Sequence, residues 1–206
     1  MKGKFIVIEG IDGAGCGTQT EILKERINAL FSQPVLHLRY PDYNDPIGAS
    51  IHEFLHKKFY ISPEIQFLLY SINMLKDMDD IRSAQAKNRV ILADRYFTTT
   101  LAYQCLQGFS EDKALKFSRL FNIIKPDLVF YLKISADTSL KRKKKEKNEL
   151  DRYEENKDFQ RKISRKYDDL AKRNVFARKW IVVDGEKSID EISDEIFSTV
   201  KKYLKI

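Results

Sequence analysis

Short apolar runs alternate along the chain with longer segments in which apolar residues recur every three or four positions. The short runs predict strands at residues 4–10, 35–41, 89–96, 126–134 and 179–185. The longer segments predict helices at residues 18–31, 47–56, 62–87, 98–108, 111–124, 158–173 and 188–205. Strands that alternate with helices favour an α/β fold, in which a mainly parallel sheet is flanked by helices on both faces. Because the sequence has no internal repeat and no linker, residues 1–206 are expected to form a single domain.

The first predicted strand leads into the segment GIDGAGCGTQ, residues 10–19, and then into a predicted helix. Ligands of parallel sheets bind at the carboxyl ends of the strands, so this loop and the loops after residues 41 and 96 are expected to meet there. Glycines free the backbone to turn its N–H groups toward an anion at the start of the helix. The segment therefore predicts a phosphate-binding loop made of Gly10, Gly13, Ala14, Gly15, Cys16, Gly17, Thr18 and Gln19.

This loop departs from the pattern GxxxxGK[ST], because Cys16 replaces the lysine that normally contacts the β- and γ-phosphates. The hydroxyl group that helps to hold Mg²⁺ is also displaced by one residue, since Gly17 precedes Thr18. Three interpretations are open: a working site that takes its charge from elsewhere, a loop that binds nucleotide without catalysis, and a glycine-rich turn without a ligand. Cys16 itself is interpreted as a small neutral side chain rather than as a redox-sensitive thiol.

Basic residues exceed acidic ones, and the formal net charge of +7 indicates anionic partners. Much of the excess lies in KRKKKEKNELDR, residues 141–152, which is interpreted either as a solvated charged face or as a segment that binds an anion. Nucleic-acid binding is not expected, because this run has no interleaved aromatic residue.

Other features of the sequence exclude several classes of protein. It has no run of 18 apolar residues and no recognisable signal peptide, so neither a membrane protein nor an exported one is expected. Cys16 and Cys105 are too few for a disulfide framework, and both are expected to be free thiols in the cytosol. The three histidines do not have the spacing of metal ligands.

Five segments together resemble the thymidylate kinase family of P-loop nucleoside monophosphate kinases. They occur in the expected order and are FIVIEGIDGAGCGTQ, RYPDYNDPIG, ILADRYFTTTLAYQ, PDLVFYLKI and ELDRYE. The resemblance runs from residue 4 to about residue 195, and the part from DRY to YQ is the most specific. It implies a three-layer P-loop kinase fold and transfer of the γ-phosphate of ATP to a deoxynucleoside monophosphate, with dTMP as the favoured acceptor. It also implies Mg²⁺ as a cofactor and a homodimer.

The resemblance assigns roles to individual residues. Asp12 matches a catalytic carboxylate that positions phosphate and metal, and Thr18 and Asp94 are the expected groups on the Mg²⁺ side. Arg95 matches the catalytic arginine that holds the acceptor phosphate, a task that suits a bidentate guanidinium group. Tyr70 is expected to stack on the base, and Tyr103 is expected to crowd the sugar 2′ position. Both belong to an acceptor site made of Asp42, Tyr43, Tyr70, Met74, Arg95, Thr99, Thr100, Tyr103 and Gln104.

Two acceptor-site positions depart from the family pattern. Met74 stands where an arginine usually hydrogen-bonds the thymine edge, and Thr100 stands where an amide or a serine is common. Methionine offers no strong hydrogen-bond donor, so a kinase for dCMP, UMP or another monophosphate is an alternative. A catalytically weak nucleotide-binding protein is a second alternative, because of Cys16.

Residues 141–155 match the lid segment of the family. One type of family member places a basic residue in the phosphate loop, whereas another keeps the loop small and supplies arginines from the lid. Gly13 followed by Ala14 resembles the second type. The resulting hypothesis is that lid closure replaces the missing loop charge, with Arg142 and Arg152 as catalytic groups among the lid residues Arg142, Lys145, Lys147 and Arg152.

Overall fold

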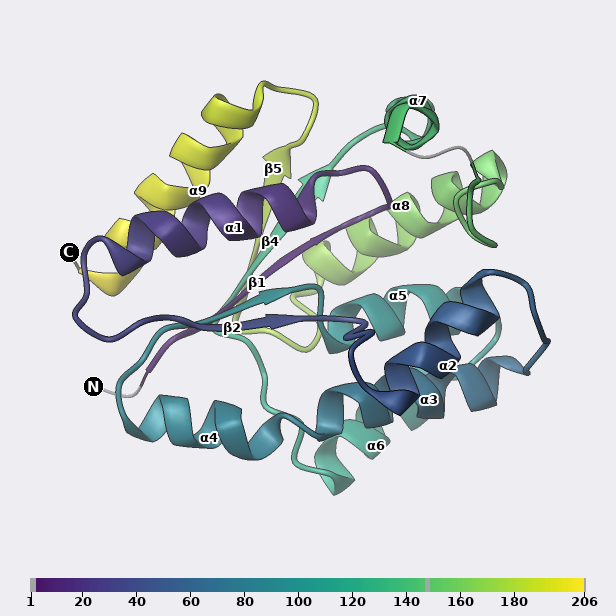
Figure 1. Cartoon of the computed structure of the whole chain (residues 1–206), viewed down its shortest axis with the longest axis horizontal. Helices are drawn as coiled ribbons and strands as arrows, with labels where there is room; N and C mark the ends of the chain where they lie inside the picture. The colour runs from purple at the N-terminus through teal and green to yellow at the C-terminus, as the bar shows by residue number, and fades with distance from the viewer. Residues whose placement is uncertain (1–2, 147–148, 206) are drawn as a thin grey trace.

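A computed structural model of the chain describes residues 3–146 and 149–205. Its centre is a five-stranded sheet in the order β2-β3-β1-β4-β5, and every pair of neighbouring strands is parallel (Figure 1). The strands are β1 (Phe5–Gly10), β2 (Leu36–Arg39), β3 (Ile91–Asp94), β4 (Leu128–Lys133) and β5 (Lys179–Asp184). Each lies within one of the five predicted apolar runs, and the α/β fold is confirmed.

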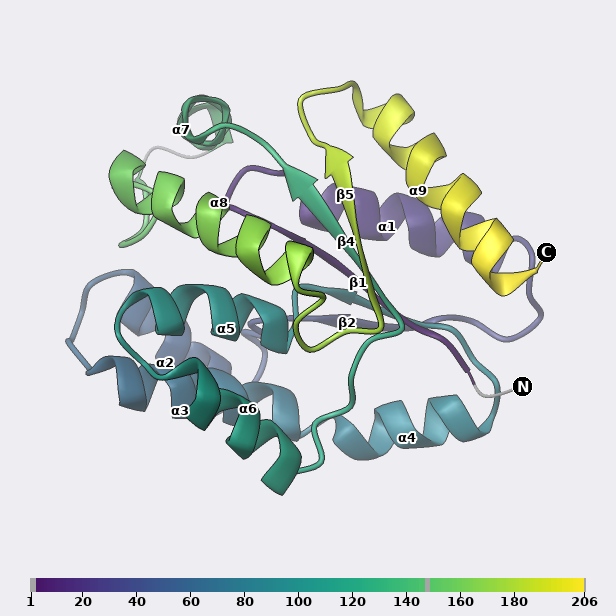
Figure 2. The same cartoon turned by 180° about the vertical axis from the view of Figure 1, so that it is seen from behind.

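Helices cover both faces of the sheet. One face carries α1 (Cys16–Asn28) and α9 (Ile189–Leu204), which pack against each other. The opposite face carries α4 (Met78–Ala86), α5 (Phe97–Leu106) and α8 (Lys157–Lys172), which Figure 2 shows from behind the molecule. The remaining helices lie farther from the sheet and are α2 (Pro46–Leu55), α3 (Pro63–Leu75), α6 (Glu111–Leu120) and α7 (Ala136–Glu146). Within the described residues, no helix combines the length and apolar character needed to cross a membrane.

The central strand β1 is buried along its whole length, because strands lie on both sides of it and helices cover both faces. Its partners are in register with Phe5 opposite Ile91 of β3 and Ile6 opposite Leu128 of β4. A strand buried on both faces reads as a continuous apolar run, which explains why FIVI was a reliable signal. The loop that follows β1 therefore begins from the most firmly held part of the sheet.

The prediction of one long helix at residues 62–87 is wrong, because α3 and α4 are separate helices that meet at Lys76 and Asp77. The Nζ atom of Lys76 contacts the Asp42 carboxylate at 2.8 Å, and the Tyr40 hydroxyl donates to Asp77 at 2.8 Å. These contacts bind the turn between α3 and α4 to the segment after β2. Because they form only in the folded protein, the helical spacing of the sequence does not predict them.

Helix α7 was not predicted as a helix, because its highly charged sequence has almost no apolar periodicity. Only Ala136 and Ser139 are buried on it. Its start is capped by Ser135, whose Oγ accepts a hydrogen bond from the backbone N–H of Thr138 at 3.0 Å. Because α7 has no apolar face, it is held by this local cap and by polar contacts to the phosphate loop, which are described below.

Candidate active site

The predicted phosphate-binding loop connects β1 to α1 and takes two left-handed turns. Gly13 and Gly15 have φ angles of 76° and 90°, a conformation that costs glycine little. Gly10 has another constraint, because a Cβ atom there would lie 2.7 Å from the Cβ of Ala14. The first turn of α1 follows at once, so its free N–H groups and the positive end of its dipole face the loop.

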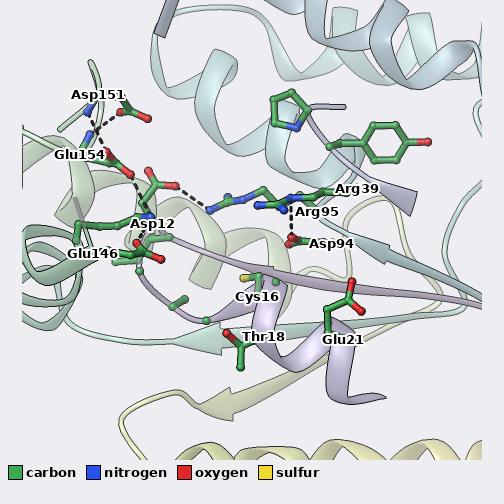
Figure 3. A pocket seen from close by; sticks show the side chains of 18 of the residues that line it. Asp12, Cys16, Thr18, Glu21, Arg39, Asp94, Arg95, Glu146, Asp151 and Glu154 are labelled. Carbon is green, nitrogen blue, oxygen red and sulfur yellow. Dashed lines mark hydrogen bonds and ion pairs between the residues drawn. The ribbon is translucent and has the colours of Figure 1, made fainter. Parts of the chain in front are cut away.

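A cavity of about 560 Å³, here called the phosphate cavity, lies against this loop. It is lined by residues 11–18 and by side chains from β2, β3 and the segment that includes α7. In Figure 3, Cys16 and Thr18 lie at the start of α1, Arg39, Asp94 and Arg95 lie together on one side, and Asp12, Glu146, Asp151 and Glu154 lie on the other. The three predicted strand-end loops therefore do meet at one cavity.

Cys16 supplies no positive charge to the phosphate cavity. Its thiol lies close to Gly10, because a Cβ atom on Gly10 would be 3.1 Å from the sulfur. Burial raises the pKa of the Cys16 thiol well above its ordinary value, so the group is neutral at physiological pH. This favours the interpretation of Cys16 as a small neutral side chain. Both cysteines are free, as expected.

Two other loop residues differ in their placement. Thr18 is exposed and lines the phosphate cavity. Gln19 is buried and turns away, because its side-chain amide donates to the carbonyl of Ile189 at 2.9 Å and so joins α1 to α9. The structure therefore gives the Gln19 side chain a contact outside the loop.

Arg95 and Asp12 form an ion pair that joins two strand ends. The guanidinium group of Arg95 donates to the carbonyl of Gly10 and to Oδ1 of Asp12, both at 2.8 Å. The other oxygen of Asp12 accepts from the Tyr103 hydroxyl at 3.0 Å and from the Gln160 amide at 3.1 Å. Arg95 also has a φ angle of 64°, an uncommon conformation that often marks functional positions. The pair is thus fixed from several directions.

Glu9 stabilises the segment that follows Arg95, and the sequence analysis did not predict this role. Its side chain is fully buried. The carboxylate accepts hydrogen bonds from the backbone N–H of Tyr96 at 3.0 Å, the Tyr167 hydroxyl at 2.9 Å and the hydroxyl groups of Thr98 and Thr99. Burial raises the pKa of Glu9, although these donors and Arg95 oppose the shift. Glu9 therefore binds the start of α5 to the central strand, directly after Arg95.

A second cavity of about 90 Å³, here called the acceptor cavity, shares Asp12 and Arg95 with the phosphate cavity. Gln104 lines it and is only 1% exposed, yet neither its amide nitrogen nor its amide oxygen has a hydrogen-bond partner among the described residues. A buried amide without partners is costly unless a ligand satisfies it. The predicted residues brought together here are Asp12, Tyr43, Tyr70, Arg95, Thr99, Tyr103 and Gln104.

Three predicted acceptor-site residues do not line this cavity itself. Met74 and Thr100 are buried around an adjoining space of about 10 Å³, which is lined by Tyr70, Arg95 and Thr99 as the acceptor cavity is. Asp42 lines neither main cavity, because its carboxylate contacts Lys76 at 2.8 Å and its backbone pairs with the side chain of Asn73. Asp42 shapes the loop after β2 rather than the wall of the cavity.

The predicted lid cations are divided in the structure. Arg142 donates to the carbonyl groups of Gly13 at 3.2 Å and Gly185 at 3.0 Å. Arg152 donates to the carbonyls of Phe54 and Phe59 and lies over the Phe54 ring. Lys145 is exposed and does not line the phosphate cavity, and Lys147 lies outside the described residues. Arg142, Lys145 and Arg152, the predicted lid cations that the structure describes, therefore do not converge on the cavity in this conformation.

The comparisons with known proteins agree with this geometry. Residues 8–196 match the family model described as thymidylate kinase. The chain belongs to the thymidylate kinase family. A thymidylate kinase of Dictyostelium discoideum is 32% identical over 96% of this chain and 84% of its own length. A probable thymidylate kinase of Methanocaldococcus jannaschii is 33% identical over 96% of this chain and 95% of its own length.

A solved structure gives the same result for the fold. The thymidylate kinase of Candida albicans, described as having broad substrate specificity, has 25% sequence identity and a TM-score of 0.76. The match covers 98% of this chain and 92% of that one. The P-loop kinase fold expected from the sequence is therefore confirmed.

Sequence reasoning missed two cations of this thymidylate kinase family member. Arg39 ends β2 and lines the phosphate cavity, with its Nε atom 3.5 Å from the Asp94 carboxylate. Lys143 lines the same cavity from α7. The signal for Arg39 was present, since it stands near the end of the strand predicted at residues 35–41, and the loop after that strand was expected to enter the site. Lys143 stands in a run of three lysines, and only the helix shows which of them faces inward.

Proposed function

We propose that this protein transfers the γ-phosphate of ATP to dTMP, giving ADP and dTDP. The observation that carries the proposal is the shared wall of the two cavities. Asp12 and Arg95 line both the phosphate cavity beside the glycine loop and the acceptor cavity beside Tyr70 and Gln104. A shared arginine can hold the acceptor phosphate next to the ATP phosphates, which brings the two reacting groups in line.

The acceptor cavity supports a pyrimidine deoxynucleotide. The Tyr70 ring is available to stack on a base, and the Tyr103 hydroxyl is held by Asp12, which fixes the ring as a wall beside the sugar. The buried Gln104 amide can donate to a base carbonyl and accept from a ring N–H, as the thymine edge requires. This amide is the polar group we assign to the base in place of the arginine replaced by Met74.

Each residue of the site has a task in the transfer. The loop N–H groups and the α1 dipole bind the ATP phosphates. Arg95 neutralises the acceptor phosphate, and Asp12 holds the arginine in position through the 2.8 Å ion pair. We also propose that residues 141–155 act as a lid that excludes water, so that the phosphoryl group passes to the nucleotide acceptor.

The residues of the phosphate cavity also fit a bound Mg²⁺ ion. Asp94 approaches the loop so closely that a Cβ atom on Gly17 would lie 3.2 Å from its Oδ2, and Thr18 lines the same cavity. No three histidine, cysteine or acidic side chains among the described residues could hold a metal by themselves. That suits an ion held by few protein oxygens together with substrate phosphates. When bound, Mg²⁺ would neutralise charge on the phosphates.

The acceptor can be identified with a panel of monophosphates in a coupled assay of ADP release. We expect the highest kcat/KM with dTMP and lower values with dUMP, dCMP and UMP. Turnover of dCMP or UMP without turnover of dTMP would contradict the proposed acceptor. Binding of ATP without turnover of any monophosphate would instead support the catalytically weak alternative that Cys16 suggests.

The catalytic roles expected of the two lid arginines have a separate test. Arg142→Ala and Arg152→Ala are each expected to lower turnover far more than ATP affinity. Wild-type turnover in both variants would exclude these roles. The contacts of Arg152 with Phe54 and Phe59 require a parallel measurement of thermal stability, because their loss would also loosen the lid segment.

We further propose a cytosolic homodimer. Ile65, Leu68 and Ile72 form an exposed apolar stripe on α3, with side chains between 42% and 50% exposed. Such a stripe suits the face of a second copy. Light scattering should give twice the chain mass, and Leu68→Glu should shift it to the monomer mass. A monomeric wild-type protein at micromolar concentration would contradict the dimer.

A further inference from the structure

The phosphate cavity has few cations that could do the work of the missing loop lysine. The lysine and arginine side chains among its described lining residues are Arg39, Arg95 and Lys143. Arg95 is occupied by Gly10 and Asp12. Arg39 is 72% exposed and lies beside Asp94, at the end of β2. Lys143 is the remaining cation, and it approaches from the opposite side of the loop.

Helix α7 is docked directly on the phosphate loop. Arg142 donates to the carbonyl of Gly13 at 3.2 Å, and a Cβ atom on Gly13 would lie 3.0 Å from the carbonyl oxygen of Ser139. The same guanidinium group also donates to the carbonyl of Gly185, at 3.0 Å, and so ties α7 to the loop after β5 as well. This docking places the next residue, Lys143, at the edge of the cavity with only 18% of its side chain exposed.

Two carboxylates hold the Lys143 ammonium group. Its Nζ atom lies 2.5 Å from Glu146 and 3.3 Å from Glu154. Burial lowers the pKa of Lys143, but the hydrogen bond to Glu146 and the charge of Glu154 outweigh burial and leave the pKa above its ordinary value. The group is therefore a cation throughout the physiological pH range.

We propose that Lys143 binds the β- and γ-phosphates of ATP and so replaces the lysine that Cys16 displaces. This inference rests on the proposed function as an ATP-dependent kinase. The flexible four-carbon stem lets the ammonium group leave Glu146, whose side chain is 63% exposed and can be solvated by water. Glu154 keeps its hydrogen bond from the backbone N–H of Asp151 at 2.9 Å.

The ammonium group of Lys143 stabilises negative charge on the phosphates and transfers no proton. During the reaction the bond between the γ-phosphorus and its bridging oxygen breaks, and a bond forms between the γ-phosphorus and an oxygen of the acceptor phosphate. The bridging oxygen leaves with ADP and carries the developing negative charge. Lys143 stays protonated and stabilises that charge, as a loop lysine does in other P-loop enzymes.

The first test compares Lys143→Met with Lys144→Met, a neighbouring exposed lysine on the same helix. Lys143→Met is expected to lower kcat about 100-fold or more, in line with the loss of one preorganised charge contact. Lys144→Met is expected to stay within twofold of wild type. Equal effects of the two substitutions, or a kcat for Lys143→Met within threefold of wild type, would overturn the proposal. Thermal unfolding shows whether each variant is folded.

The second test asks whether the two positions are interchangeable. Adding Cys16→Lys to Lys143→Met is expected to restore kcat at least tenfold, because the ammonium group returns by the route that other P-loops use. Failure of this folded double variant to gain activity would count against the exchange.

The third test does not depend on the acceptor. Calorimetric titration should show that Lys143→Met weakens ATP binding at least tenfold and leaves AMP binding unchanged, because AMP lacks the β- and γ-phosphates. Equal losses for both nucleotides, or none for ATP, would overturn the proposal even if the double variant does not fold. If the wild-type protein turns over no monophosphate, the proposed function fails, while this titration still decides the role of Lys143.

Discussion

Arg95 and Lys143 reach the same cavity but are held in opposite ways. Arg95 is bound by a backbone carbonyl and by Asp12, whose other oxygen is itself held by Tyr103 and Gln160. Lys143 is held by two carboxylates, one of which is mostly exposed. The Arg95 side of the site is therefore fixed before any ligand binds, whereas the α7 side can exchange its contacts.

This difference matches the two demands of phosphoryl transfer. Two anionic groups must be aligned, which favours rigid donors that need no rearrangement during the reaction. ATP must also enter and ADP must leave, which favours contacts that can be broken at little cost. In this protein the fixed cation follows β3 and the exchangeable one belongs to α7. A loop lysine would be a fixed cation. Because Cys16 stands in its place, the charge that binds the ATP phosphates is supplied by an exchangeable cation on α7.

The largest effect is expected from Arg95→Lys, which keeps the charge and removes the forked geometry. A lysine has one nitrogen in place of the two that contact Gly10 and Asp12 separately, so it cannot reproduce both contacts and present a forked donor to an acceptor phosphate, and we expect kcat/KM for the acceptor to fall about 1,000-fold. Affinity for ATP should change less than threefold. Steady-state kinetics with calorimetry of ATP binding measures both. A loss of less than tenfold in kcat/KM would show that position 95 needs a positive charge but no forked geometry. The rigid contacts of Arg95 would then no longer distinguish it from Lys143.

The next effect concerns the support beneath Arg95. Glu9→Gln turns one of the two accepting oxygens into an NH₂ group, so two of the four hydrogen bonds lose their acceptor and we expect the free energy of unfolding to fall by about 2 to 3 kcal/mol. Urea denaturation measures the loss. Thr98→Ser keeps the hydroxyl donor and serves as the matched control, with an expected loss below about 1 kcal/mol. If the two substitutions cost the same, the Glu9 network does not fix the start of α5.

The sequence indicated the rigid side of the site much better than the exchangeable side. Apolar runs such as FIVI predict buried strands, and the ends of parallel strands must meet, so Asp12 and Arg95 were placed correctly near one another. Glu9 was missed because one acidic residue in an apolar strand does not reveal its four donors. These donors come from residues 87 to 158 positions away in the chain.

The α7 side was harder to predict for a physical reason. A run of lysines has no periodic apolar residues to show which side of a helix is buried. Nothing in KRKKKEK therefore distinguishes Lys143 from Lys144 and Lys145. The helix and its docking through Arg142 decide which side chain faces the cavity, and both depend on the backbone carbonyls of Gly13 and Gly185. The break between α3 and α4 has the same kind of cause, since it is set by contacts of Lys76 and Asp77 with distant residues.

The smallest predicted effect concerns Asp151, which follows α7 in the chain and lines both cavities. Burial, together with the charges of Asp12 and Glu154, raises the pKa of Asp151 to about 6. The folded protein thus binds a proton more tightly at this carboxyl group than the unfolded chain does, whose pKa is near 3.8. Stability from this group is greatest below about pH 4 and declines as the pH rises to about 6, above which the cost of the buried charge is complete.

Asp151→Asn removes that charge and keeps an oxygen that can accept from the backbone N–H groups of Tyr153 and Glu154. We therefore expect the variant to be more stable than wild type by about 1 to 2 kcal/mol at pH 8, allowing for partial solvent screening. The two proteins should converge near pH 4. Urea denaturation at one-unit intervals from pH 4 to pH 8 measures the difference. A difference that stays constant over this range would mean that the charge of Asp151 does not destabilise the folded protein. The exchange of contacts on the α7 side would then depend on Lys143 and Glu146 alone.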